Sequence, residues 1–285
     1  MTANLYALGA IALWATLAVL GVALSHVPPF LLTGVALLCG SLIALPLSRF
    51  DLRQWRVPPA TLALGVYGLF GFHFLLFMAL RIAPPVEANL VNYLWPLFIV
   101  VLAPWMLPGV TLRAGHVLAA LMGFAGAAIA ILGRSSGPVA ADGMGGTSGS
   151  WGYGLALGSA IIWATYSLGT RRVKPFATAA VGLFGVVSGA LSLLCHALLE
   201  PTTALSTRDW MLLVTTGLGP LGAAFFLWDK ALKLGDARHI GILSYLTPLC
   251  STALLIAVSG QPLTLNIGLA AALIIGAALL GTRLR

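Results

Sequence analysis

The chain has 285 residues, of which 60% are hydrophobic and only 8% are charged. A soluble domain has about 25% charged residues, so this composition excludes an ordinary soluble protein. The formal net charge is +8, but the basic residues do not gather into one face of the kind that binds nucleic acid.

Apolar stretches of membrane-spanning length recur along the whole chain. A helix needs about 20 apolar residues to cross a bilayer, and unbroken apolar runs without alternation argue against a transmembrane barrel. We therefore predict an all-α polytopic membrane protein with ten transmembrane helices. In chain order the predicted spans are Leu5–Leu24, Phe30–Ser48, Thr61–Leu80, Pro85–Leu107, Ala114–Gly133, Trp151–Thr170, Phe176–Leu199, Trp210–Ala231, Ile240–Ser259 and Leu263–Thr282.

The first half of the sequence is echoed in the second half. Ile11–Thr16 returns as Ala160–Thr165 after 149 residues, and Asn92–Leu97 returns as Ser244–Leu249 after 152 residues. The Gly- and Ser-rich stretch 134–150 falls between the copies and is typical of a flexible linker. We predict two five-helix repeats, 1–133 and 151–285, joined by a periplasmic linker at 134–150.

Five spans per repeat is an odd number, so the second copy is expected to cross the bilayer in the opposite direction. With the N-terminus inside, 12 of the 15 Lys and Arg residues fall on the inner side, and only Arg81, Arg134 and Arg208 fall outside. The positive-inside rule then predicts that both termini are cytoplasmic. Inverted repeats commonly enclose a transport site at their interface, and we expect a central cavity there.

Polar and aromatic residues at bilayer depth are candidates for the cavity lining, because burying them without a purpose is costly. Trp14 in the first span and Trp163 in the sixth are related by the repeat, and both lie away from the interfaces where Trp usually collects. Thr165 accompanies Trp163, and His73 lies near the centre of the third span. The alternative is helix packing, which for His73 means a hydrogen bond between helices and no proton-carrying role.

The fourth span carries a polar stripe that ends at a proline. Asn92 and Tyr93 lie on one side of a helix with Asn89, and Pro96 removes the usual hydrogen-bond partner of the Asn92 carbonyl, which can kink the helix. Paired kinks are what rocking repeats need, although packing alone would also explain them. The candidate lining residues here are Asn92, Tyr93 and Trp95, the ninth span adds Tyr245, and the candidate hinges are Pro96 and Pro248.

The carboxylates avoid the middle of every predicted span. Glu87 lies in the first turn of the fourth span, where it complements the helix dipole and could pair with Arg81. Asp229 lies at the inner end of the eighth span, next to Lys230. A structural role is the simpler interpretation of both, and they remain the candidates for ion coupling. We therefore expect facilitated export that is driven by the gradient of the substrate.

The sequence predicts no catalytic site, no metal site and no cofactor. Its three cysteines lie inside predicted spans without metal-ligand spacing, and we interpret them as small apolar fillers. The sequence contains no HExxH motif, no Walker loop and no plausible nucleophile–base pair. The expected partners are a small-molecule substrate and the lipid bilayer, without nucleic acid, and the expected state is a monomer.

These residues give the chain a resemblance to the drug/metabolite transporter superfamily of the EamA type. The resemblance rests on Val91–Pro96, Ile162–Tyr166 and Ser244–Pro248 and covers nearly the whole length. It implies ten helices in two inverted five-helix repeats and an inner-membrane exporter of aromatic and other neutral amino acids that works by alternating access. It also implies a central cavity, onto which Tyr93, Trp95, Trp163 and Tyr245 map.

Two other functions remain open on the sequence. One is an exporter of drugs or other small metabolites from the same superfamily, with proton coupling as an option. The other is a membrane protein that acts as a structural or signalling partner and carries no cargo. Matched cavity-type residues in both repeats argue against the second. The lack of a fixed Arg or Asp at depth predicts weak binding and broad selectivity.

Overall fold

The computed structural model describes residues 2–132, 149–259 and 265–283. Every regular element in these ranges is helical, and nine helical stretches among them are long and apolar enough to cross a bilayer. The chain is therefore a multi-pass helical membrane protein. The linker predicted at 134–150 lies outside the described residues except for its last two positions, as do the predicted span ends Gly133 and Leu263.

Most spans of the first half are divided into shorter helices, whereas the sequence predicted a kink only in the fourth span, at Pro96. At the first break, the hydroxyl and the backbone N–H of Thr16 both donate to the carbonyl of Leu13, at 2.6 and 3.1 Å, which tightens the turn. The elements of this half are α1 (Thr2–Ala15), α2 (Leu17–Ala23), α3 (Pro29–Ser41), α4 (Ala44–Leu47), η1 (Leu52–Trp55), α5 (Pro59–Val66), η2 (Tyr67–Gly71), α6 (Phe72–Ile82), α7 (Pro85–Asn92), α8 (Trp95–Met106) and α9 (Ala114–Leu132).

The second half begins with α10, which is 21 residues long but is not among the nine most apolar stretches. Its glycines and its hydroxyl-bearing residues make it less apolar than the other long helices. The elements of this half are α10 (Gly149–Gly169), η3 (Thr178–Ala180), α11 (Val181–Leu199), α12 (Thr207–Leu218), η4 (Gly219–Ala223), α13 (Ala224–Leu234), α14 (Ala237–Leu243), α15 (Leu246–Ser259) and α16 (Leu265–Arg283).

Helix interruptions recur at equivalent positions of the two halves. The third and eighth predicted spans each contain a π-helical segment, and these segments begin at Tyr67 and Gly219, 152 residues apart. The fourth and ninth predicted spans each break a few residues before a proline, between α7 and α8 and between α14 and α15. Such irregular segments often mark functional sites.

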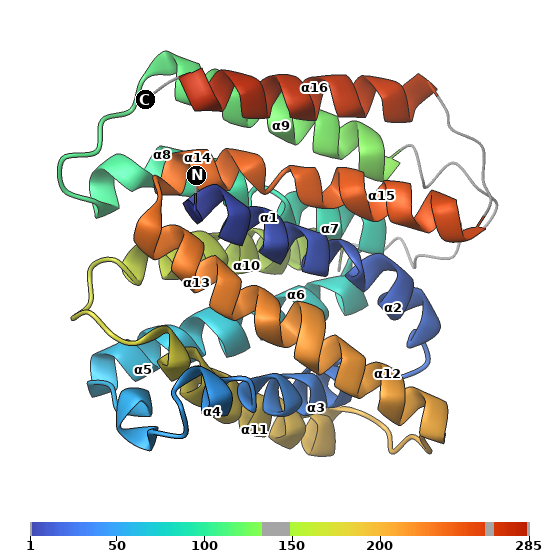
Figure 1. Ribbon diagram of the computed structural model, residues 1–285. Coiled ribbons are helices and arrows are strands. Elements are labelled where there is room, and N and C mark those ends of the chain that lie inside the picture. The colour runs from blue at the N-terminus through green and yellow to red at the C-terminus, as the bar shows by residue number, and fades with distance from the viewer. Residues whose placement is uncertain (1, 133–148, 260–264, 284–285) are drawn as a thin grey trace.

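The packing between helices also repeats. The helix α1 packs against α13 and α15, and α10, which holds the equivalent place in the second half, packs against α6 and α8. The pairs α3 with α11 and α9 with α16 each join one helix from each half. Figure 1 shows these two pairs along opposite edges of the bundle, with the remaining helices between them.

The two ends of the bundle differ in charge. The helix α1 begins at the end where α10 finishes (Figure 1). The connections α4–α5, α8–α9, α10–α11 and α13–α14 lie at this same end, which we call the basic end, whereas α2–α3 and α11–α12 are joined at the far end. The first three of these basic-end connections contain Arg49, Arg53, Arg56, Arg113, Arg171, Arg172 and Lys174.

Candidate functional site

A cavity of about 690 Å³ lies between the two halves of the chain. Its wall takes residues from α1, α2, α6 and α7 in the first half and from α10, α13 and α15 in the second. Leu24, Ser25 and Pro29, around the α2–α3 connection, line its mouth together with Arg81 near the C-terminal end of α6. The cavity therefore opens toward the far end of the bundle.

Four aromatic rings form the bottom of this cavity. On α1, Trp14 lines the cavity, whereas Ala7 and Ala10, nearer the basic end, are fully buried in helix packing. The ring of Trp14 lies 5.9 Å from that of Trp163, its repeat partner, and 6.3 Å from that of Phe225, measured between centroids. Trp95 completes the group at 6.4 Å from both Trp14 and Trp163. We call these four side chains the aromatic floor.

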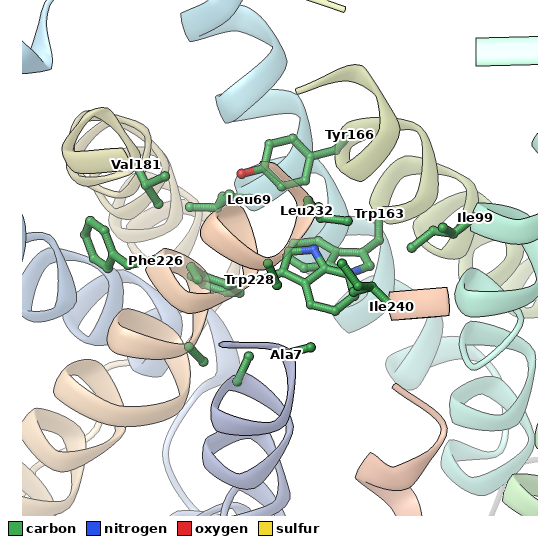
Figure 2. Packing of buried hydrophobic residues seen from close by; sticks show 14 of the residues in the cluster. Ala7, Leu69, Ile99, Trp163, Tyr166, Val181, Phe226, Trp228, Leu232 and Ile240 are labelled. Carbon is green, nitrogen blue, oxygen red and sulfur yellow. The ribbon is translucent and has the colours of Figure 1, made fainter. Parts of the chain in front are cut away.

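A fifth ring supports the floor from the side of the basic end. Trp228 is 1% exposed, does not line the cavity, and lies 5.2 Å from Trp14 and 6.5 Å from Trp163. Its indole N–H donates to the hydroxyl of Ser167 at 3.1 Å. Figure 2 shows the rings of Trp163 and Trp228 at the centre of the packed cluster, with Tyr166 close by. The cavity is therefore closed toward the basic end.

His73 on α6 lines the cavity with one of its ring nitrogens tied down. Its Nδ1 lies 2.6 Å from the carbonyl oxygen of Leu69, and because a carbonyl can only accept, Nδ1 carries the proton. In the neutral ring, Nε2 is then a hydrogen-bond acceptor. The rings of Phe77 and Phe225, at 5.8 and 6.2 Å, pack against the imidazole and hold its orientation.

Asn92, at the end of α7, also has one of its two polar side-chain atoms in a hydrogen bond within the protein. The hydroxyl of Ser159 on α10 lies 2.8 Å from Oδ1 of Asn92 and 2.7 Å from the carbonyl oxygen of Ala156, and it shares its proton between these two acceptors. Among the described contacts this is the only side-chain hydrogen bond of Asn92, so its amide nitrogen keeps two N–H donors for a ligand. Asn92 is 5% exposed and lines the cavity. Because Asn92 and Ser159 are both buried, the amide is held in one place.

The cavity has a polar wall and an apolar wall. The polar wall lies on α7 and α15, and the apolar wall lies on α6, η4 and α13. Such a division suits a ligand with a charged or polar end and an apolar body. The polar wall carries Asn89, Asn92, Tyr93, Thr247 and Ser251, and the apolar wall carries Phe72, Leu76, Phe77, Leu221 and Phe225.

The structure brings most of the residues predicted from sequence to this cavity. Six of the eight candidate lining residues line it, as does the candidate hinge Pro248, whereas Pro96 is buried at the start of α8 outside the lining. The six are Trp14, His73, Asn92, Tyr93, Trp95 and Trp163.

The other two candidates, Thr165 and Tyr245, lie outside the lining of the cavity. Thr165 donates to the carbonyl of Ile161 at 2.7 Å and lies 2.9 Å from the hydroxyl of Tyr67, between α10 and η2. Tyr245 is fully buried and packs against α9, next to Phe124. Both side chains contact neighbouring helices and do not face the cavity.

The two candidate coupling carboxylates are also outside the lining. The sequence suggested an ion pair between Glu87 and Arg81, but the structure does not contain it. Arg81 is bound at 3.2 Å by Glu200, which the fold brings to the end of α6. Glu87 instead accepts a hydrogen bond from the hydroxyl of Tyr153. Asp229 is buried and forms an ion pair with Lys233 at 2.6 Å.

Several lining residues were missed at the level of sequence. The clearest is Phe225, which stands 152 residues after His73 and packs against its ring in the lining. The repeat offset therefore contained the signal. Asn89 was noted in the polar stripe of the fourth span but was not selected, and Thr247 was not selected from the ninth span. Leu221 and Phe77 are ordinary apolar residues that only the fold distinguishes.

Comparisons with known proteins agree with this geometry. The model of the EamA-like transporter family matches residues 1–132 and 150–283, one stretch in each half. The aromatic amino acid exporter YddG of Ancylobacter novellus is 41% identical over 288 residues, which covers 99% of this chain and 98% of that protein. A crystal structure of another protein superposes with a TM-score of 0.91 at 39% identity, covering 100% of this chain and 98% of that one.

Proposed function

The chain belongs to the EamA-like transporter family, and on this premise we propose that it exports aromatic and other neutral amino acids by alternating access. The observation that carries the proposal is the cavity between the halves. The aromatic floor lines it together with His73 and Asn92, each of which has one polar atom bound within the protein and one left for a ligand. The printed name of the 41% identical relative supports the substrate class.

In this proposal α10 also crosses the membrane and brings the number of spans to ten, and the two halves are inverted five-helix repeats over 1–133 and 151–285. The opposite directions of α1 and α10 (Figure 1) and the recurring π segments support this arrangement. The protein acts as a monomer in the inner membrane. Its basic end, with both termini, faces the cytoplasm, as the positive-inside rule requires, and the open mouth faces the periplasm.

The substrate binds with its charged groups between the polar wall and His73, which projects from α6 among the apolar residues. The Nε2 atom of His73 accepts a hydrogen bond from the ammonium group, and the amide N–H groups of Asn92 donate to the carboxylate, because these are the atoms that the protein leaves unused. The aromatic side chain of the substrate lies against Trp163 and Phe225, where ring contacts favour apolar groups with little directional demand. Tyr93 and the ring of Trp14 complete the enclosure.

Transport then requires the aromatic floor to open toward the basic end while the mouth closes. The breaks ahead of Pro96 and Pro248 supply the points at which the helices bend. Arg81 is the only charged residue among the described residues that line the cavity. Without a carboxylate in the lining, the substrate gradient itself drives export.

The test is uptake by liposomes that contain the purified protein. Labelled phenylalanine, tryptophan, methionine and threonine should each enter well above the background of empty liposomes, with phenylalanine and tryptophan saturating at high concentration. The proposal would be wrong if none of the four crosses while the protein remains folded by thermal-unfolding criteria.

A further inference from the structure

The open mouth of the cavity has a counterpart at the basic end. Arg81 lines the mouth and lies over the ring of Phe30, with 5.8 Å from its guanidinium carbon to the centroid. Its repeat partner Lys233 stands 152 residues later, near the end of α13, and lies over the ring of Phe176 at 3.8 Å. The two positions are therefore equivalent in setting as well as in sequence.

The equivalence extends further into the bundle. Leu17 and Ala18 line the open cavity next to Trp14, and their partners 149 residues later are Tyr166 and Ser167. Both partners are buried: the ring of Tyr166 lies 5.4 Å from that of Trp163, and the hydroxyl of Ser167 accepts the indole N–H of Trp228. Figure 2 shows Tyr166 next to Trp163. The residues of the second half that correspond to the lining of the open cavity are therefore packed together near the basic end, without a cavity between them.

A buried carboxylate stands in this closed space. Asp229 is the repeat partner of the cavity-lining Phe77, and it is 2% exposed. Its Oδ2 binds the ammonium of Lys233 at 2.6 Å and accepts from the hydroxyl of Thr178 at 2.7 Å. Its Oδ1 is buried without a hydrogen-bond partner in the described part of the chain.

An unpartnered buried carboxylate oxygen is costly, so its retention at this position calls for an explanation. Lys233 is less buried and also donates to the carbonyl of Phe176 at 2.9 Å. An arriving zwitterion carries one ammonium and one carboxylate, so it can replace the internal ion pair with two external ones. A neutral or singly charged molecule cannot do so without leaving a buried charge unpaired.

We propose that Asp229, Lys233 and Thr178 form a second binding site, closed in this structure, for the charged groups of a zwitterionic α-amino acid arriving from the basic end. This inference rests on the proposed function. Asp229 binds the ammonium and Lys233 binds the carboxylate when the space opens. The same two side chains also bind the hydroxyl of Thr178 in η3 and the carbonyl of Phe176, so the exchange loosens the attachment of α13 to this segment and binding favours opening.

The test compares ligands that lack one charged group. Phenylalaninamide keeps the ammonium and lacks the carboxylate, and each compound is assayed as an inhibitor of phenylalanine transport from the basic-end face of sided membrane vesicles. The wild type should favour phenylalanine over phenylalaninamide by about tenfold, the usual effect of one charge-assisted hydrogen bond. Lys233→Gln should remove most of this preference, and Lys233→Arg should retain it.

A matched control uses the neighbouring ion pair. Arg238 binds Asp236 at 2.5 Å near the same end, but Arg238 is not the repeat partner of any residue that lines the open cavity. Arg238→Gln should leave the preference for phenylalanine unchanged. Asp229→Asn is the complementary variant, with 3-phenylpropionate, which lacks the ammonium, as its probe. The preference for phenylalanine over this anion should fall.

The outcomes separate this site from the proposed function. If the wild type transports phenylalanine and Lys233→Gln keeps the full preference over phenylalaninamide, the site is overturned and the ion pair is structural. If Lys233→Gln lowers the thermal stability but keeps the preference for phenylalanine, the ion pair is likewise structural and the site is overturned. If the wild type transports no amino acid, the proposed function fails and this site with it.

Discussion

Two polar side chains of the cavity, His73 and Asn92, each use one of their two polar atoms in a hydrogen bond within the protein. His73 gives Nδ1 to Leu69, and Asn92 gives Oδ1 to Ser159. Each keeps a second atom of opposite character, an acceptor on the ring and donors on the amide. In the proposed binding mode these atoms hold the two charged groups of the substrate without a fixed charge, and we expect a low affinity, which would ease release of the substrate.

The histidine can be tested by a variant that preserves its packing. His73→Phe should keep the ring contacts to Phe77 and Phe225 but remove the acceptor for the ammonium. We expect the KM for phenylalanine in liposomes to rise by about tenfold, the effect of one hydrogen bond to a charged group. His73→Gln, which restores an acceptor, should recover part of the loss. An unchanged KM in His73→Phe would assign the histidine to helix packing.

Trp163 is expected to affect both folding and transport. The residue is 3% exposed, and its ring contacts those of Trp14, Phe72, Trp95, Tyr166, Phe225 and Trp228. Truncating a buried aromatic costs about 3–5 kcal/mol, so Trp163→Ala should lower the unfolding temperature and the rate per folded molecule together. Trp163→Phe should be milder in both assays. Trp163→Ala with wild-type stability would show that the ring is not part of the packed floor.

At the scale of elements, the sequence identified the helices that line the cavity, but it did not predict which side of each helix a given side chain occupies. Trp14 and Trp163 were found because a repeated aromatic in mid-span is unusual. Tyr245 carried the same signal, yet it packs against Phe124 on α9, whereas its repeat partner Tyr93 lines the cavity. Local sequence does not encode that difference. Nor does it encode the long-range meeting of Arg81 with Glu200, 119 residues away.

The contact of Tyr245 with α9 gives a prediction about glycine. A Cβ built on Gly123 would lie 2.4 Å from Cδ2 of Tyr245, whose side chain is fully buried. Gly123→Ala should therefore destabilise the protein by about 1–3 kcal/mol through overpacking, measured by thermal or denaturant unfolding in detergent. Gly268→Ala, on α16 with nothing within 4 Å of the added Cβ, is the control and should be neutral or stabilising. Equal effects at both positions would contradict the close approach.

For the whole molecule, the sequence predicted the helical membrane class, the duplication and the charge asymmetry between the two ends. These follow from composition and repetition, which need no knowledge of contacts. The sequence did not predict that the cavity would be open at the far end and sealed by the aromatic floor. That outcome depends on how the two halves pack against each other, which composition and repetition do not determine.

The absence of carboxylates among the described lining residues leads to a prediction about energy coupling. An imposed proton or sodium gradient across the liposome membrane should not drive accumulation of phenylalanine above its equilibrium level, whereas an opposing phenylalanine gradient should accelerate exchange. Uptake with and without each gradient, followed over time, measures this. Accumulation driven by a pH gradient would refute facilitated transport and point to Asp229 or His73 as the proton-binding residue.

The buried Glu200 has a consequence for how the mouth closes. Its carboxylate accepts the N–H groups of Phe30 and Leu31 at 3.0 and 3.2 Å, and it also binds Arg81 and His196. One side chain thereby joins the beginning of α3, the end of α6 and the end of α11 into a stiff rim. If the mouth closes as the proposed function requires, we expect α2, α7 and α15, which Glu200 does not hold, to move more than this rim.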